Sequence, residues 1–136
     1  MSNALHPNPS PRDRRLGLRV PLEIFMTQYI RDRPVRALTT NVSDTGIFVQ
    51  TVASPTVRRA MDRKTPVALE FELPGTGEII WARGELCYGT GDQMVHGTGV
   101  RFTAMPTIHA RLLRDFCVET RRARLGSLLA RIRGQA

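Results

Sequence analysis

Two short polar motifs in this chain of 136 residues carry side chains that can bind an anion. The first is Arg15-Leu-Gly-Leu-Arg19, in which two guanidinium groups are four positions apart. In an extended chain these groups lie on one face, about 13 Å apart, and can reach different parts of one ligand. Each guanidinium can pair bidentately with a phosphate or with the O6 and N7 edge of guanine. The spacing alone is weak evidence, because Arg59 and Arg63 repeat it.

The second motif is Asn41-Val42-Ser43-Asp44-Thr45-Gly46, which ends a predicted strand in a turn. Asn41 and Ser43 are two residues apart, and we expect them to point to the same face. Gly46 permits a positive φ or the close approach of a ligand. Taken alone, the motif also fits an ordinary Asx or type I turn.

The net charge of +8 is concentrated at the two ends of the chain. The first 19 residues hold four arginines and one acid, and residues 121–136 hold five arginines and no acid. This distribution favours an anionic partner that is bound by a terminus. The second arginine cluster is also typical of a solvated helix face, and docking to a partner or to an anionic surface is the alternative.

The elements that must position these motifs are predominantly strands. Alternating apolar residues predict six strands joined by short turns, the first with Val20, Leu22, Ile24 and Met26 on its inner face. Strands follow at about 35–42, 47–52 and 67–73, then a long strand through Trp81 and a last strand over 96–102. Residues 31–34 and 89–91 are expected to be connections, and residues 55–64 a loop with at most one helical turn.

The end of the chain predicts a helix that packs on the strands. Pro106 suits the first helical position. The expected apolar stripe consists of Ile108, Leu112 and Phe116, with Leu113 and Cys117 as further members. We expect Gly126 to interrupt the helix. The predicted organisation is therefore a flexible arm at 1–13, a strand-rich domain at 14–103, and a helix with a basic tail at 104–136.

Several function classes lack their usual sequence signals. The histidines His6, His96 and His109 are scattered without metal-ligand spacing, and no paired carboxylates, activated nucleophile or phosphate-binding loop are recognisable. Cys87 and Cys117 are expected to be buried thiols. The start of the chain has no apolar run typical of an export signal, and no stretch has the composition of a transmembrane helix. We therefore expect a cytoplasmic protein that is not an enzyme and holds no metal.

The two motifs together, in this order and at this spacing, resemble the PilZ domain family. The resemblance runs from about Arg14 to Phe102 and includes the segments GIFVQT, EIIWARGEL and GTGVRF. It implies an all-β-dominated fold, a six-stranded antiparallel PilZ-type β-barrel with a C-terminal α-helix packed on it. It also implies a bacterial, non-enzymatic receptor for cyclic di-GMP, which is a ligand and not a cofactor.

The family resemblance also implies the ligand-binding residues, which are Arg14, Arg15, Arg19, Asn41, Ser43 and Gly46. In the family an arginine at the position of Arg14 tends to accompany two bound nucleotides, which favours two over one. The implied output is regulation of a downstream protein in motility, pili or exopolysaccharide systems, and the sequence leaves both that partner and the oligomeric state open.

The alternative function is that of a small basic β-barrel that binds nucleic acid non-specifically, which an isoelectric point near 11.1 would suit. The body of the chain between the basic ends is neutral, and it lacks interleaved aromatic and basic residues along one strand face. We therefore expect no DNA partner.

Overall fold

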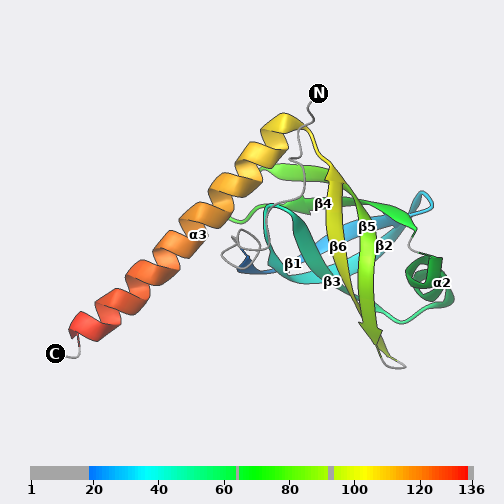
Figure 1. Ribbon diagram of the computed structural model, residues 1–136, viewed down its shortest axis with the longest axis horizontal. Helices are drawn as coiled ribbons and strands as arrows, with labels where there is room; N and C mark the ends of the chain where they lie inside the picture. Colours follow the sequence, from blue (N-terminus) through cyan, green and yellow to red (C-terminus); the bar gives the residue numbers. More distant parts are fainter. Residues whose placement is uncertain (1–18, 64, 92–93, 135–136) are drawn as a thin grey trace.

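The computed structural model describes residues 19–63, 65–91 and 94–134. Six antiparallel strands form a closed barrel in the spatial order β1-β2-β3-β6-β5-β4 (Figure 1). The strands are β1 (Val20–Ile30), β2 (Arg33–Val42), β3 (Gly46–Val52), β4 (Pro66–Glu72), β5 (Ile79–Gly91) and β6 (Val95–Ala104). Sequential strands pair through hairpins except between β3 and β4, and β1 closes the barrel by pairing with β4. The predicted six-stranded antiparallel barrel is confirmed.

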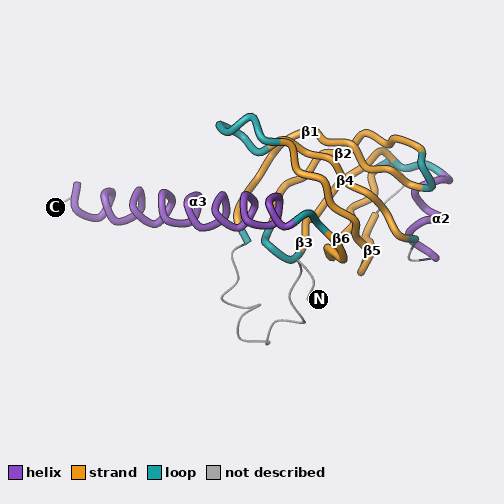
Figure 2. The backbone as a smooth tube through the Cα atoms, turned by 90° about the horizontal axis from the view of Figure 1, so that it is seen from above, coloured by secondary structure: helices purple, strands orange, loops and turns teal. Residues whose placement is uncertain are grey.

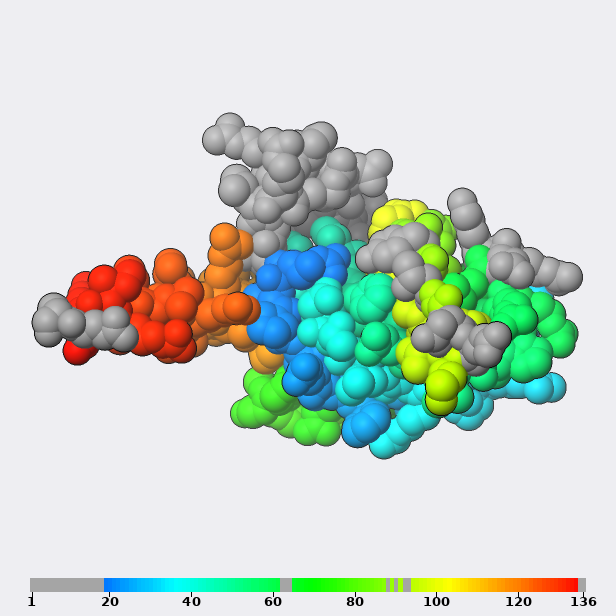
Figure 3. All heavy atoms as spheres, turned by 90° about the horizontal axis from the view of Figure 1, so that it is seen from below, coloured from blue at the N-terminus to red at the C-terminus, as the bar shows by residue number. Residues whose placement is uncertain are grey.

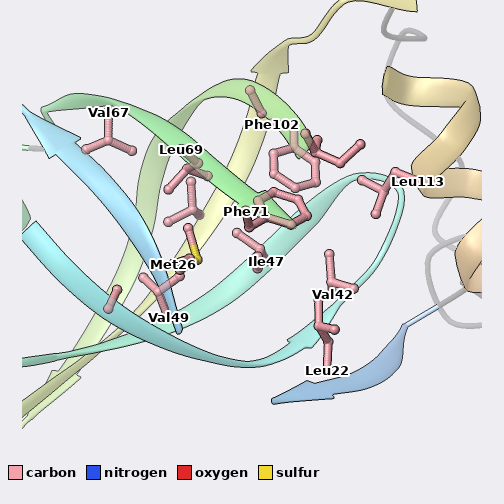
Figure 4. Packing of buried hydrophobic residues seen from close by; sticks show 14 of the residues in the cluster. Leu22, Met26, Val42, Ile47, Val49, Val67, Leu69, Phe71, Phe102 and Leu113 are labelled. Atoms are coloured by element: carbon pink, nitrogen blue, oxygen red, sulfur yellow. The ribbon is translucent and has the colours of Figure 1, made fainter. Parts of the chain in front are cut away.

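The barrel interior is filled by the apolar residues that alternate along the strands. Val49, Leu69 and Ile80 are fully buried, and Phe71 belongs to the same core cluster. Figure 4 shows Val49, Leu69 and Phe71 inside the barrel. The inner face predicted for β1 is confirmed for Val20, Leu22 and Met26, while Ile24 is only half-buried beside a register shift. This burial drives closure of the sheet, because apolar area removed from water is the main favourable contribution to folding.

Three predicted connections differ from the structure. The β1–β2 turn is shorter than expected, because Arg31 and Asp32 both adopt positive φ and form a two-residue hairpin turn. The glycines of 89–91 continue β5 and do not form a loop. These glycines pair with β6, where Gly89 lies opposite Thr98.

The predicted loop at 55–64 is instead the helix α2 (Pro55–Arg63), and the expectation of at most one turn was wrong. The Ser54 hydroxyl accepts a hydrogen bond from the Val57 backbone N–H at 3.2 Å and caps the helix. Val57 and Ala60 are buried against the barrel. Tertiary burial of this short apolar face stabilises a helix that is too short to be stable alone.

The helix α3 (Thr107–Gly134) begins after Pro106 and runs 28 residues. Figures 1 and 2 show that its first turns lie on the barrel and that the rest projects away from it, at the end opposite α2. Leu113 and Cys117 are fully buried, and Leu113 joins the core cluster (Figure 4). The helix does not break at Gly126, because one exposed glycine costs only about 1 kcal/mol in a long helix.

Two further burial predictions were wrong. Ile108 is 57% exposed, so the predicted stripe is wrong at its first member only. Leu112 and Phe116 are partly buried against the core, and Leu113 and Cys117 are fully buried in it. Cys87 is exposed on β5, because it occupies the outward-facing phase of that strand beside the buried Leu86. The prediction that Cys117 is buried is confirmed.

Candidate functional site

The turn between β2 and β3 is held together by the hydroxyl of Ser43. This oxygen accepts hydrogen bonds from the backbone N–H groups of Thr45, at 3.2 Å, and Gly46, at 3.1 Å. The Ser43 N–H donates to the Gly46 carbonyl oxygen at 2.8 Å. Ser43 is 5% exposed. Its hydroxyl is therefore engaged within the turn, where it serves as an acceptor for two backbone N–H groups.

Gly46 is required by the packing of the barrel itself. Its φ is not positive, and the close approach is made by the protein itself. A Cβ at this position would lie 2.7 Å from the Val100 carbonyl oxygen of β6. Gly46 thus allows β3 and β6 to pair tightly beside the turn.

Asn41 is placed by an irregularity in β2. The register of β2 against β3 shifts between Thr39 and Asn41, which leaves Thr40 as an extra residue. The buried Thr39 hydroxyl donates to the Phe48 carbonyl oxygen at 2.8 Å. It thus links β2 to β3 at the point where their backbone pairing is irregular. Asn41 is half-buried at the barrel wall. Its carboxamide can accept a hydrogen bond from Arg19, the residue that precedes β1.

Arg19 precedes β1 directly and joins the two motifs. Its guanidinium donates a hydrogen bond to the Asn41 side-chain oxygen across 22 positions of sequence. Pairing of Pro21 with Asn41 brings the start of β1 to this point. Arg19 is exposed. Arg14 and Arg15 lie outside the described residues, so of the predicted arginines the structure locates Arg19 only.

A hollow of about 160 Å³ lies beside Arg19, and Arg101 and Cys87 also line it. The remaining lining residues are Thr45, Ile47, Gly99 and Val100. Arg101 forms an ion pair with Glu85. Sequence reasoning missed Arg101, although the alternation that buries Val100 and Phe102 already places Arg101 on the outer face.

The first turns of α3 lie next to this site. Burial raises the pKa of the Cys117 thiol to about 12, with a further increase from Asp44 and an opposing decrease from Arg19. The thiol of α3 is therefore within electrostatic reach of both motif regions. Contact between α3 and β1 agrees with this placement.

A larger hollow of about 350 Å³ lies elsewhere on the barrel, between Trp81 and Pro106. Trp81 stacks on Tyr29, with ring centroids 5.7 Å apart, and its backbone N–H donates to His109 Nδ1 at 3.0 Å. Of the predicted ligand residues that the structure describes, none lines this hollow. We therefore assign the candidate site to the smaller hollow, because a predicted ligand residue, Arg19, lines it.

The family profile of the PilZ domain matches residues 13–119. The chain belongs to the PilZ domain family. The match includes both motifs and the first turns of α3, so the resemblance drawn from the sequence is confirmed. No curated protein matches the chain.

Two solved structures share the PilZ fold of this chain. The Bacillus subtilis inhibitor of motility MotI/DgrA matches with a TM-score of 0.66 and 16% identity over 83% of this chain. The Borreliella burgdorferi PlzA protein in complex with c-di-GMP matches with a TM-score of 0.53 and 7% identity over 80% of this chain. The present chain spans about half the length of both, 52% in each case.

Among the residues that the structure describes, no cluster of three or more His, Cys, Asp or Glu side chains is arranged to hold a metal ion. Within the same residues, no helix combines the length and the apolar composition needed to cross a bilayer.

Proposed function

We propose that this PilZ domain is a non-enzymatic receptor for cyclic di-GMP, which it binds at the hollow beside Arg19. The observation that carries the proposal is the hydrogen bond from Arg19 to Asn41. It brings the last arginine of the RxxxR motif into contact with the first residue of the NxSxxG motif, which is distant in sequence. Membership of the family and the c-di-GMP complex of the PlzA relative support the choice of ligand.

The electrostatics of Arg19 suit an anionic nucleotide. Among the described residues Arg19 is bonded to a neutral carboxamide and has no carboxylate in ion-pair contact. Its guanidinium has five N–H donors, of which Asn41 takes only one. The remaining fork can pair with a phosphate or with the O6 and N7 edge of guanine, and the ion contact would be charge-assisted.

The other motif residues contribute to the proposed site in different ways. Asn41 orients Arg19, and its amide group can reach the ligand from the barrel wall. Ser43 and Gly46 act through the turn, which they hold in place. Arg14 and Arg15 are proposed to complete the binding site. Arg15 would bind guanine or phosphate, and Arg14 would bind a second nucleotide, which gives two nucleotides per chain.

The hollow is too small to enclose a dinucleotide, since pockets that bury drug-sized ligands measure roughly 300–1,000 Å³. The ligand would therefore lie over the surface and be covered by the segment that precedes Arg19. Closure of that segment would present a changed surface to a downstream cytoplasmic partner, which the chemistry of this site does not identify. Hydrogen exchange of residues 10–19 with and without nucleotide tests this closure, and protection already present without nucleotide would contradict it.

Titration calorimetry with cyclic di-GMP tests the proposal, with GTP and a short DNA duplex as competing ligands. Arg19→Ala should weaken binding at least tenfold, because a hydrogen bond to a charged group contributes about 1.5–3 kcal/mol. Arg19→Lys should be nearly as damaging, since an ammonium cannot form the bidentate fork. Asn41→Ala should have a smaller effect in the same direction.

The matched control is Arg33→Ala, which removes an exposed arginine at the opposite end of β2 from Asn41. It should leave the affinity unchanged. Equal affinity in wild type, Arg19→Ala and Asn41→Ala would refute the site. Binding of the DNA duplex without binding of the dinucleotide would favour the nucleic-acid alternative. Saturation at one nucleotide, unaffected by Arg14→Ala, would refute the proposed stoichiometry.

A further inference from the structure

The distal half of α3 carries apolar side chains that contact no part of the barrel's core cluster. Leu125, Leu128, Leu129 and Ile132 are 45–70% exposed. Their spacing of three, four and seven positions places them on one face of a helix. Figure 3 shows this part of α3 extending beyond the barrel. The four residues, called here the distal stripe, form an apolar surface without a partner in the described chain.

The distal stripe is not a continuation of the face that holds α3 on the barrel. At about 100° per residue, its centre lies about 90° around the helix from Leu113 and Cys117. Those two residues are fully buried, whereas the stripe is open to solvent. The barrel therefore does not block access to the stripe.

Arginines flank the stripe on both sides. Arg122 and Arg133 lie on one flank and Arg124 and Arg131 on the other, about 70° to 110° from the stripe's centre. All four are exposed, and the sequence has no acid after Glu119. Arg122 is bonded to Glu119 in an exposed pair, which solvent screens. The back of the helix carries only small residues there, among them Ala123, Ser127 and Ala130.

These features argue against a second copy of the chain as the occupant. Pairing two distal stripes would bring their flanking arginines together without an acid to offset them. The stripe also spans only about two turns, whereas coiled coils are typical of apolar repeats sustained over three or more heptads. The same two turns would also be too short for a stable coiled coil with an acidic helix of another protein.

An anionic bilayer surface fits both the charge and the shape. Helices that lie in the membrane interface combine an apolar face with arginine or lysine on the polar face. Arginines at the boundary can keep their methylene groups in the apolar layer while the guanidinium reaches a phosphate. We propose that residues 121–134 of α3 bind in the plane of an anionic lipid surface, with the distal stripe in the acyl boundary and the flanking arginines on the headgroups.

The test is co-sedimentation of the full chain, without nucleotide, with vesicles of phosphatidylcholine containing phosphatidylglycerol. Wild type should bind these vesicles, bind pure phosphatidylcholine vesicles weakly, and dissociate as salt is raised. Leu128→Gln with Leu129→Gln should lower the partition coefficient at least about tenfold, because the favourable transfer of each leucine side chain from water to the acyl layer is lost. Ala123→Gln with Ala130→Gln, on the back of the helix, should bind like wild type.

All four substituted positions are exposed, and circular dichroism checks that each variant keeps its helix. Absence of wild-type binding, equal binding to both vesicle types, or binding that survives loss of the two leucines would each overturn the proposal. A concentration-dependent dimer in sedimentation velocity that Leu128→Gln with Leu129→Gln abolishes, without vesicle binding, would assign the stripe to a second copy instead. A monomeric protein that does not bind vesicles would refute the lipid proposal and favour a protein partner.

Discussion

Gly46 and Val100 approach so closely that a Cβ on Gly46 would lie 2.7 Å from the Val100 carbonyl oxygen. The two residues belong to neighbouring strands, in which Gly46 pairs with Arg101 and Ile47 with Val100. The glycine of the second motif therefore acts on strand packing, at the point where the turn of Ser43 joins the barrel. Stability measurements can separate this role from ligand contact.

Gly46→Ala should destabilise the protein by about 1–3 kcal/mol, the usual cost of forcing an extra group into a packed site. Urea unfolding measures the change. Gly126→Ala is the matched control, because a Cβ there meets nothing within 4 Å. It should stabilise the exposed helix by up to about 1 kcal/mol. Equal stability of Gly46→Ala and wild type would show that β6 can move aside.

Ser43→Ala should destabilise the protein by about 1–3 kcal/mol, because the buried Gly46 N–H loses its acceptor. Nucleotide affinity should fall as well, through loosening of the turn. Ser127→Ala is the control, since Ser127 is exposed on α3 and does not line the hollow beside Arg19. If Ser43→Ala weakens binding while unfolding at the wild-type urea concentration, the hydroxyl contacts the ligand and our interpretation of the turn is wrong.

Cys117 should make stability depend on alkaline pH. Its pKa is raised from 9.0 to about 12, chiefly by burial, so the unfolded chain releases the thiol proton first. The contribution is present in full below pH 9 and declines as pH rises toward 12, by at most about 1.4 kcal/mol per pH unit. The difference between wild type and Cys117→Ala in urea unfolding across this range isolates it. A constant difference would contradict the raised pKa.

Cys87 offers a probe of the proposed site, because it is exposed and lines the same hollow as Arg19. Alkylation by iodoacetamide should be fast at Cys87 and absent at the buried Cys117 in the folded protein. Saturating cyclic di-GMP should slow the reaction at Cys87, and Arg19→Ala should restore it at the same nucleotide concentration. Alkylation at an unchanged rate with the nucleotide bound would place the ligand elsewhere.

Local patterns in the sequence determined the strands and marked the two motifs. Alternation of apolar residues specified the inner face of β1 and the outward position of Arg101, because side-chain period in a strand is a local property. The helical spacing of apolar residues, judged without the neighbouring strands, extended the predicted stripe to Ile108, which is exposed. Local patterns also failed to predict α2, whose nine residues are helical because Val57 and Ala60 are buried against the barrel.

The roles of the motif residues were decided by tertiary structure alone. The sequence singled out Asn41, Ser43 and Gly46 as one group, but it contains no information on which backbone atoms come near them. Contact between Arg19 and Asn41 depends on the pairing of β1 with β2, and the need for glycine at 46 depends on a carbonyl 54 positions later in β6. Such long-range approaches are set by closure of the barrel, which no local pattern encodes.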